Sequence, residues 1–412
     1  MKEIFEQHFY DSASALVSKK SKKHKLSIDV FRSLEPFLLN FEEDTQTAFT
    51  KWTFSQINNY GYPNYVRETP NEFQYITESI LYSNDCPVVE VQEQLAWIKG
   101  CGQQHEQRTP EWFAFRANLI SASTLSKIFG TESLRKSLLK DKLISKSMGK
   151  TAATEHGVLF EPVAQELFEI MTDSVVSEYG CIQHRVHKHV GASPDGIVTS
   201  SKNPSMLGRM LEIKCPYSRE ICGLPKYDYW VQVQIQLEVC DLEYCDFFEC
   251  EFDMYYNSDD FFRYLEERID TEKRYYGITI ESQKNTEKDV KRTYSKIYGN
   301  KDDNKDDIEE LKIWYDKNIN ETIESDCDNI VFKAWTLRKH SRVTIQRNRM
   351  WFDSVKDRIS NFWDDVIKHR TMYKDKPEEM EKLFKDVKDT SYMPQKPKVE
   401  KPVVCLIDDD SD

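Results

Sequence analysis

The 412-residue sequence lacks several features, and each absence excludes a class of protein. No apolar run reaches the roughly 18 residues that a membrane-spanning helix needs. The first residues, MKEIFEQHF, do not contain the apolar core of a signal peptide. The ten cysteines are scattered, without the close pairs of an iron–sulfur site or a disulfide scaffold. We therefore expect an intracellular protein with reduced thiols and no contact with a membrane.

Positive charge is also scarce. The sequence has 57 lysine and arginine residues against 70 aspartate and glutamate residues, for a net charge of −13. This balance argues against nonspecific binding of nucleic acid by the whole surface, although a local basic groove is compatible with it. His184, His187 and His189 are close in sequence, but no cysteine or histidine follows at zinc-finger spacing. The histidines therefore fit exposed strand positions better than a zinc site.

The chemistry of the chain is concentrated in GASPDG (191–196) and LEIK (211–214). Asp195 and Glu212 offer the oxygen ligands that a hard divalent cation prefers. Lys214 comes two residues after Glu212, so both side chains lie on the same face of a strand. Two carboxylates, a cation and an ammonium group are suited to hydrolysis of a phosphodiester. Taken alone, SPDG is also a common turn, and Glu212 with Lys214 could form a structural ion pair.

Five segments together resemble the family of lambda-phage exonuclease and the YqaJ-type viral recombinases, within the PD-(D/E)XK nuclease superfamily. In chain order they are WFAFRANLISAS (112–123), HGVLFEPVA (156–164), SPDG (193–196), LEIKCP (211–216) and YWVQVQIQ (229–236). Details such as RMLEIK are most similar to the branch carried by nucleocytoplasmic large DNA viruses. The resemblance implies an α/β fold, a restriction-endonuclease-like core with a mixed central sheet flanked by helices, with a helical N-terminal addition here.

The resemblance also implies a role for each acidic residue of the motifs. Asp195 and Glu212 would bind Mg²⁺, or Mn²⁺ in its place, and the backbone carbonyl of Ile213 would add a ligand. Glu161 would join the same acidic cluster, directly on the metal or through water. Lys214 would orient the attacking water, lower its pKa or stabilise the charged transition state.

Other motif residues would bind the DNA. Arg116, Ser123 and Ser193 match positions that the family uses to hold a terminal 5′-phosphate, although Arg116 could instead pair with a helix carboxylate. Gln234 would hydrogen-bond the scissile strand or the attacking water, unless it is a buried amide satisfied by backbone groups. Trp112 is four residues before Arg116 on the same helical face, and we expect it to pack against that arginine.

The chain divides into five parts: a helical N-terminal region (1–90), a nuclease core (91–280), a charged surface insertion (281–330), a C-terminal strand and helix of the core (331–373), and a disordered acidic tail (374–412). Helices are predicted over 91–98, 111–118, 154–171, 260–275 and 351–368, and strands over 185–190, 209–214, 247–252 and 342–345. The segment 229–239 alternates like a strand, whereas the resemblance implies a helix, which we adopt.

Three further segments are candidates for binding. The lysine-rich run 19–25 could contact DNA phosphates or be a solvated loop. The basic residues Lys339, Arg342, Arg347 and Arg349 are candidates for the rim of a DNA channel. The sequence PVVCLIDDDSD (402–412) resembles a SUMO-interacting motif and could equally dock a single-strand annealing, single-strand binding or replication protein.

The function expected from these features is Mg²⁺-dependent 5′-to-3′ exonuclease activity on linear double-stranded DNA with a 5′-phosphate end, for viral recombination, repair or replication. The alternatives are a structure-specific endonuclease and a catalytically silent scaffold that binds DNA ends. An RNA substrate is not excluded by any sequence feature. The resemblance places the protein in the host-cell cytoplasm, at viral factories, or in the nucleus, and it allows a homo-oligomer, since the family includes ring-shaped trimers.

Overall fold

A computed structural model describes residues 75–76, 88–101, 105, 109–144, 151–221, 225–268, 274–284, 290–299, 305–325 and 327–385. The helical region predicted for residues 1–90 therefore lies almost entirely outside the described residues, as do the lysine-rich run and the motif at the C-terminal end. None of the helices in the described ranges is long and apolar enough to cross a membrane.

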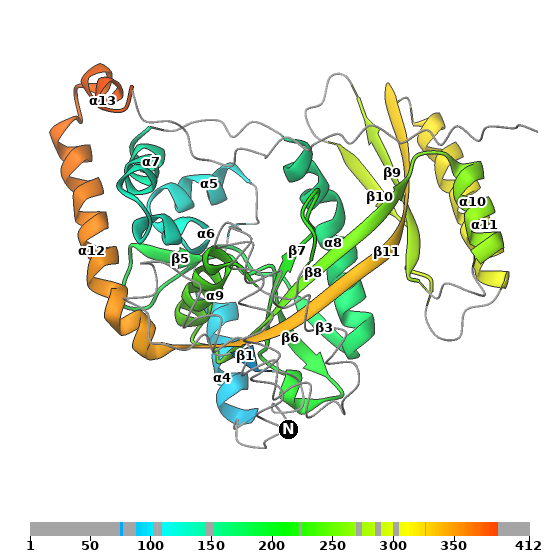
Figure 1. Cartoon of the computed structure of the whole chain (residues 1–412), viewed down its shortest axis with the longest axis horizontal. Coiled ribbons are helices and arrows are strands. Elements are labelled where there is room, and N and C mark those ends of the chain that lie inside the picture. Colours follow the sequence, from blue (N-terminus) through cyan, green and yellow to red (C-terminus); the bar gives the residue numbers. More distant parts are fainter. Residues whose placement is uncertain are drawn as a thin grey trace, which may run out of the picture.

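A curled sheet forms the centre of the molecule (Figure 1). Its strands, in spatial order, are β10 (Lys291–Tyr294), β9 (Tyr276–Gln283), β11 (Asn329–Gln346), β8 (Tyr244–Tyr255), β7 (Met210–Lys214), β6 (Gly196–Ser201) and β3 (Ser174–Ser177). The neighbours β7 and β8 are parallel and the other pairs in this order are antiparallel, so the sheet is mixed. The short strand β1 (Tyr75–Ile76) pairs antiparallel with the end of β11.

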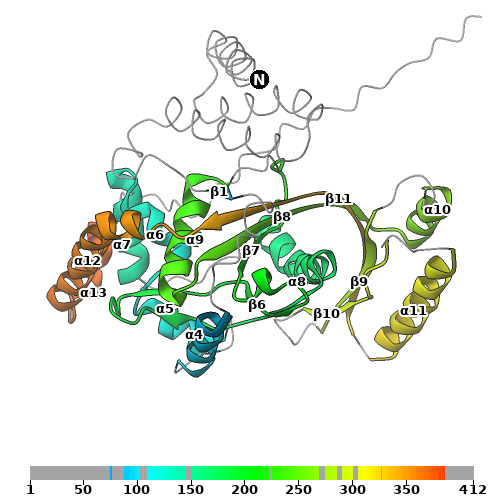
Figure 2. The same cartoon turned by 90° about the horizontal axis from the view of Figure 1, so that it is seen from below.

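Helices cover both faces of the sheet (Figure 2). On one face, α8 (Ala152–Thr172) packs on β7 and β8 through Phe160, Leu167 and Phe168. On the other face lies α9 (Tyr227–Cys240), which is buried on nearly every side. The alternation along β7 follows from this arrangement, since Leu211 and Ile213 join the α8 cluster. The predicted α/β architecture is thus confirmed.

A layer of short elements surrounds α9. They are α4 (Val88–Gly100), α5 (Pro110–Ala117), α6 (Ala122–Leu125), α7 (Glu132–Leu143), α12 (Arg349–Met372) and a small sheet of β2 (Ile120–Ser121), β5 (Val190–Ala192) and β4 (Ile182–Gln183). The helix α12 buries the apolar face that its sequence predicts, with Trp351, Val355, Ile359 and Phe362 in the core. This layer holds α5 and α7 close to the sheet.

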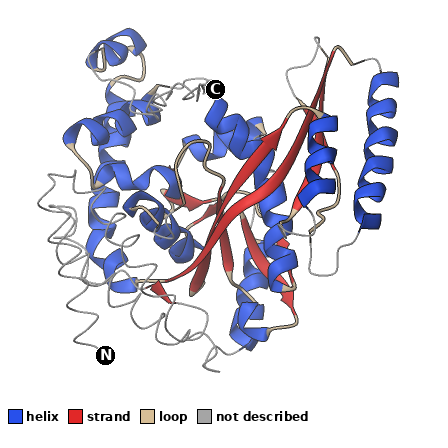
Figure 3. Cartoon of the chain, turned by 45° about the vertical axis from the view of Figure 1, so that its right-hand side comes forward, coloured by secondary structure: helices blue, strands red, loops and turns tan. Residues whose placement is uncertain are grey.

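The region predicted as a charged surface insertion is structured. The helix α11 (Lys305–Glu324) buries Ile308 and Leu311 in an apolar cluster with β9 and with Phe261 of α10 (Ser258–Arg268). The strand β11 begins at Asn329, well before the predicted 342, because it pairs first with β9 and then with β8 (Figure 3). The high charge of this segment belongs to the exposed faces of an amphipathic helix.

Three smaller expectations are also corrected. Residues 185–189 form a turn and not a strand, because the Nδ1 atom of His184 accepts the N–H groups of Val186 and His187. The helix α10 is described over Ser258–Arg268, residues 269–273 of its predicted range lie outside the described residues, and Arg274 and Tyr275 are not helical. Part of the expected disordered tail is helical, as α13 (Pro377–Leu383), and Phe384 after it is buried. The boundaries of the five parts remain predictions.

Candidate active site

Two neighbouring strands bring the predicted metal ligands together. Asp195 directly precedes β6, Glu212 lies on β7, and the two strands pair antiparallel. The Asp195 Oδ2 accepts a hydrogen bond of 2.7 Å from the backbone N–H of Ile213. Gly196 is needed at this position, because a Cβ there would lie 2.2 Å from a methyl group of Val176 on β3. The strand pairing therefore fixes the separation of the two carboxyl groups.

Glu212 is completely buried, and several donors surround its carboxylate. Its Oε1 accepts from the Lys214 ammonium and, at 2.6 Å, from the Nε2 of Gln232. Its Oε2 accepts at 2.6 Å from the Nε2 of Gln236. Gln232 and Gln236 are four residues apart on α9, so both face β7. A buried carboxylate held in this way is strongly restricted in orientation.

Charge is concentrated around Asp195. Burial raises the pKa of its carboxyl well above the usual range, and the carboxylates of Glu212 and Glu161 raise it further. The Lys214 ammonium and the Ile213 N–H oppose this shift only in part. Burial lowers the pKa of Lys214, but Glu212 and Asp195 outweigh burial, so that pKa lies above its ordinary value. Asp195, Glu212, Glu161 and Lys214 together are called the acidic cluster below.

The charges of the acidic cluster fit a divalent cation. Three carboxylates surround one ammonium group, and a cation would relieve the repulsion that raises the pKa of Asp195. Among the described residues, no group of three or more His, Cys, Asp or Glu side chains is arranged to hold a metal. Asp195, Glu212 and the Ile213 carbonyl are the groups of the acidic cluster that could hold a divalent cation, with water completing its coordination.

Gln234 lies away from the acidic cluster, contrary to the prediction. Its Nε2 donates to the backbone carbonyl of Gln346 at 2.8 Å, and its Oε1 accepts from the backbone N–H of Asn348 at 2.6 Å. Residues two positions apart on a helix point in nearly opposite directions, so Gln234 cannot share the face of Gln232 and Gln236. Its contacts are those of a buried amide that joins α9 to the β11–α12 connection.

Arg116 and Ser123 lie together, as predicted. The Arg116 Nη2 donates to the Ser123 Oγ at 3.3 Å, and the guanidinium lies over the Trp112 ring, 4.1 Å from its centroid. Thr109 caps the N-terminus of α5 and Pro110 occupies its first position, which fixes where the helix presents Arg116. In the described part of the chain, no carboxylate pairs with this guanidinium.

Ser193 connects the two groups of residues. Its carbonyl accepts a hydrogen bond of 3.5 Å from Gln236, the residue that also holds Glu212. The Cys181 thiol lies against Ser193 and within reach of the charges of Arg116 and Lys142. Arg116, Ser123, Ser193 and Lys142 are called the basic pocket below, and this pocket borders the acidic cluster.

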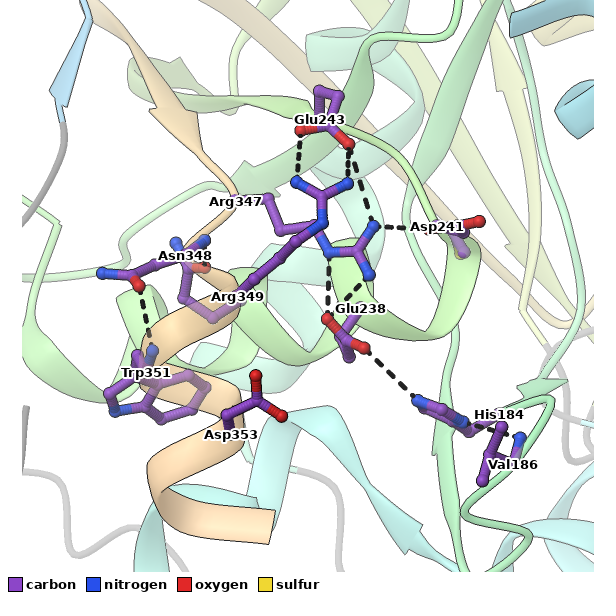
Figure 4. Close-up of polar contacts among 12 residues, drawn as sticks. His184, Val186, Glu238, Asp241, Glu243, Arg347, Asn348, Arg349, Trp351 and Asp353 are labelled. Carbon is purple, nitrogen blue, oxygen red and sulfur yellow. Dashed lines mark hydrogen bonds and ion pairs between the residues drawn. The ribbon is translucent and has the colours of Figure 1, made fainter. Parts of the chain in front are cut away.

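Two of the proposed rim arginines are engaged in ion pairs elsewhere (Figure 4). The Arg347 guanidinium is buried and bonds Glu238 at 2.8 Å and Asp241 at 2.6 Å. Arg349 holds both oxygens of Glu243. These pairs join the end of α9 and the start of β8 to the β11–α12 connection, so neither guanidinium is placed as a free DNA contact.

Sequence reasoning missed Gln236 and Lys142. The four-residue spacing of Gln232 and Gln236 would have indicated a shared helical face, once a helix had been chosen for this segment. Lys142 carries no such signal. It is 26 residues from Arg116 in a helix whose other lysines are surface residues, and only the packing of α7 beside α5 brings it to the pocket.

Comparisons with known proteins agree with the motifs. Residues 111–243 match the model of the YqaJ-like viral recombinase domain. The uncharacterized protein R354 of Acanthamoeba polyphaga mimivirus is 28% identical over 317 residues, which are 69% of this chain and 57% of that protein. The chain thus spans little more than half the length of this relative. Its viral source agrees with the predicted branch of large DNA viruses.

Solved structures give more distant matches. The alkaline exonuclease LHK-Exo from Laribacter hongkongensis has a TM-score of 0.39 and 19% identity, over 66% of this chain and 100% of that one. A phage-related exonuclease from Haemophilus somnus 129PT has a TM-score of 0.33 and 15% identity, over 61% and 95%. The family match contains Arg116, Asp195, Glu212 and Lys214 within its limits, and the predicted resemblance is confirmed. Over residues 111–243, the chain is therefore similar to the YqaJ-like viral recombinase domain.

Proposed function

We propose that the protein is a Mg²⁺-dependent exonuclease that degrades linear double-stranded DNA in the 5′-to-3′ direction from a 5′-phosphate end. The observation that carries this proposal is that two groups of opposite charge are linked through Gln236, which bonds both Glu212 and the carbonyl of Ser193. The acidic cluster is suited to hydrolysis of a phosphodiester, and the basic pocket beside it is suited to a terminal phosphate.

In the acidic cluster, Asp195, Glu212 and the Ile213 carbonyl would hold Mg²⁺, with Glu161 close by. A bound Mg²⁺ polarises the phosphate and promotes formation of hydroxide from water. The Lys214 ammonium, which keeps its proton well above neutral pH, would stabilise negative charge on the phosphate as it is attacked. Gln232 and Gln236 would keep Glu212 in one orientation throughout.

In the basic pocket, Arg116 and Ser123 would take the 5′-phosphate, while Ser193 joins them from the loop that leads to Asp195. Binding of a 5′-phosphate by these residues favours an exonuclease over an endonuclease. A terminal phosphate carries more charge than an internal one and offers an additional oxygen to the basic pocket. Binding the end next to the acidic cluster would set which phosphodiester is cut.

The product of such digestion would be a duplex with 3′ single strands, which a single-strand annealing or binding protein could use in viral recombination, repair or replication. The docking role of residues 402–412, including binding to SUMO, stays a prediction, as do a homo-oligomeric state and a place in the host cytoplasm or nucleus.

The experiment uses a linear duplex labelled at each 3′ end, in 5′-phosphate and 5′-hydroxyl versions, with Mg²⁺, with Mn²⁺ and with EDTA. The full chain, Lys214→Ala and Lys202→Ala are compared. Lys202 is the matched control, because it is an exposed lysine paired with Asp173 far from the acidic cluster. We expect wild type and Lys202→Ala to remove nucleotides stepwise from the 5′ end, and to do so faster on the 5′-phosphate duplex. Digestion should be absent with EDTA and absent in Lys214→Ala.

Closed circular DNA separates the alternatives. Cutting of a closed circle would replace the exonuclease proposal by an endonuclease. Binding of DNA ends without cleavage of any substrate would support the silent scaffold instead.

A further inference from the structure

Lys142 is a basic residue whose position in the site the motifs do not explain. It lies next to the end of α7, and its Nζ donates to the backbone carbonyl of Arg116 at 3.3 Å. The ammonium therefore lies at the C-terminal end of α5, and its charge interacts with that of the Arg116 guanidinium, which in turn contacts Ser123. Because an ammonium group has three N–H donors, this one described hydrogen bond leaves two for another acceptor.

Positive charge accumulates around Lys142, and the described carboxylate that acts on it, Asp141, is also paired with Lys127. Its pKa is lowered to about 8, first by burial and then by the cations of Arg116 and Arg370. Asp141 and the Cys181 thiol oppose this shift, but they do not balance it. Burial likewise lowers the pKa of the Arg116 guanidinium. Holding such cations together is unfavourable unless an anion binds among them, and phosphate is the anion that Lys and Arg hold best together.

A purely structural role for Lys142 is the competing explanation. Cations at the C-terminus of a helix stabilise its free carbonyl groups, and α5 ends here. Arg370 of α12 already serves this purpose, since its Nη2 donates to the carbonyls of Ala117 at 2.9 Å and Lys142 at 3.0 Å. The contact between Lys142 and the Arg116 carbonyl is longer, at 3.3 Å, and the ammonium is close enough to Cys181, which lies against Ser193, for their charges to interact.

We propose that Lys142 is a further ligand, beside Arg116, Ser123 and Ser193, for the 5′-terminal phosphate of the DNA. This inference rests on the proposed function, because it names a further residue of the same pocket. Lys142 determines specificity for the end group and takes no part in breaking the bond. It also brings α7 into the site, so that the phosphate is held from the three helices α5, α6 and α7 and from the loop at Ser193.

The test measures equilibrium binding of the full chain to a short fluorescent duplex in EDTA, with a 5′-phosphate or a 5′-hydroxyl. Wild type is compared with Lys142→Met, with Lys142→Arg and with Lys136→Met. Lys136 is the matched control on the same helix, where it is exposed and pairs with Glu132. We expect wild type to favour the phosphate end, and Lys142→Met to reduce that preference by about 10-fold or more. Affinity for the hydroxyl end should be unchanged, while Lys142→Arg and Lys136→Met keep the preference.

Two outcomes would overturn the inference while leaving the proposed function intact. Lys142→Met could retain the full preference for phosphate, or it could lose affinity for both ends equally together with a lower melting temperature. The latter would identify Lys142 as a structural cap of α5. Equal binding of both ends by wild type would instead remove the 5′-phosphate proposal itself, and this inference with it.

Discussion

The acidic cluster and the basic pocket border each other, but their charges are treated differently. Each oxygen of Glu212 has a hydrogen-bond donor, and Asp195 is tied to the backbone of β7. In the basic pocket, Arg116 and Lys142 lie together with neutral groups, and their pKa values are lowered. The carboxylates of the acidic cluster thus have protein groups as partners, whereas under the proposed function the anion that binds Arg116 and Lys142 would come from the DNA.

Substitutions in the acidic cluster and in the basic pocket should therefore affect different steps, namely bond cleavage and selection of the DNA end. Changes around Glu212 should alter the rate of bond cleavage, because they disturb the orientation of a group at the reacting centre. Changes in the basic pocket should alter the choice of DNA end, because they remove attraction for the terminal phosphate.

The largest effect is expected at the α9 glutamines. Gln232→Leu and Gln236→Leu should each lower the cleavage rate by about 10–100-fold, because each removes a donor that orients Glu212. Single-turnover kinetics at saturating protein would measure this rate directly.

Gln234→Leu is the matched control on the same helix. It should leave the cleavage rate nearly unchanged and lower the free energy of unfolding by about 1–3 kcal/mol, because two backbone groups lose their partner. Equal loss of cleavage in Gln234→Leu and Gln232→Leu would contradict this division of roles.

A smaller effect is expected from pH. The Lys142 ammonium loses its proton as pH rises through about 8, so the preference for a 5′-phosphate should fall between pH 7 and pH 9. We expect a decrease of several-fold, up to about 10-fold. The groups that face Lys142 do not produce the same change, since Arg116 and Arg370 stay charged and burial keeps the Cys181 thiol neutral.

Binding measured against pH, with both duplex ends, checks this expectation. The DNA phosphate itself is already doubly charged above pH 7, because its second pKa is about 6. Lys142→Arg should therefore give a flat profile, and a fall in that variant as steep as in wild type would exclude Lys142 as the titrating group.

The smallest effect is expected at the ion pairs that join β11 to α12. Arg349→Ala should lower the free energy of unfolding by less than about 1 kcal/mol, because the pair with Glu243 is largely exposed. It should leave the salt dependence of DNA binding unchanged.

Arg116→Ala is the comparison for this measurement. It should reduce the slope of log affinity against log salt concentration by about one, as expected for a lost phosphate contact. A weaker dependence of DNA binding on salt concentration in Arg349→Ala would show that Arg349 contacts DNA after all.

Periodicity predicted the elements that have one polar and one apolar side. The helix α12 is such a case, because the predicted helix 351–368 carries Trp351, Val355, Ile359 and Phe362 at helical spacing and all four are buried. The helix α9 does not have one polar and one apolar side, because core residues surround it and even Gln234 and Gln236 are buried. In such a helix the sequence shows no exposed face, so alternation of valine and glutamine imitates a strand.

The residues of the site were predictable to different degrees. Glu212 and Lys214 lie on one strand, so a period of two predicted their shared face. The place of Asp195 beside them was implied by the family motif and results from the pairing of β6 with β7. The choice among Gln232, Gln234 and Gln236 depends on the rotation of α9 about its axis, which no local pattern determines. Contacts between distant segments, such as Lys142 with Arg116, arise only from the packing of whole helices.

The connection between β11 and α12 begins about 100 residues after the end of the match to the family model. Nevertheless, Gln346 and Asn348 satisfy Gln234 in the middle of α9, and the apolar face of α12 completes the core around it. The stretch that is recognisable as a module in the sequence is therefore not an autonomous folding unit. An excised fragment of residues 111–243 would expose the side of α9 opposite Glu212, and its active site would lose the support on which its geometry depends.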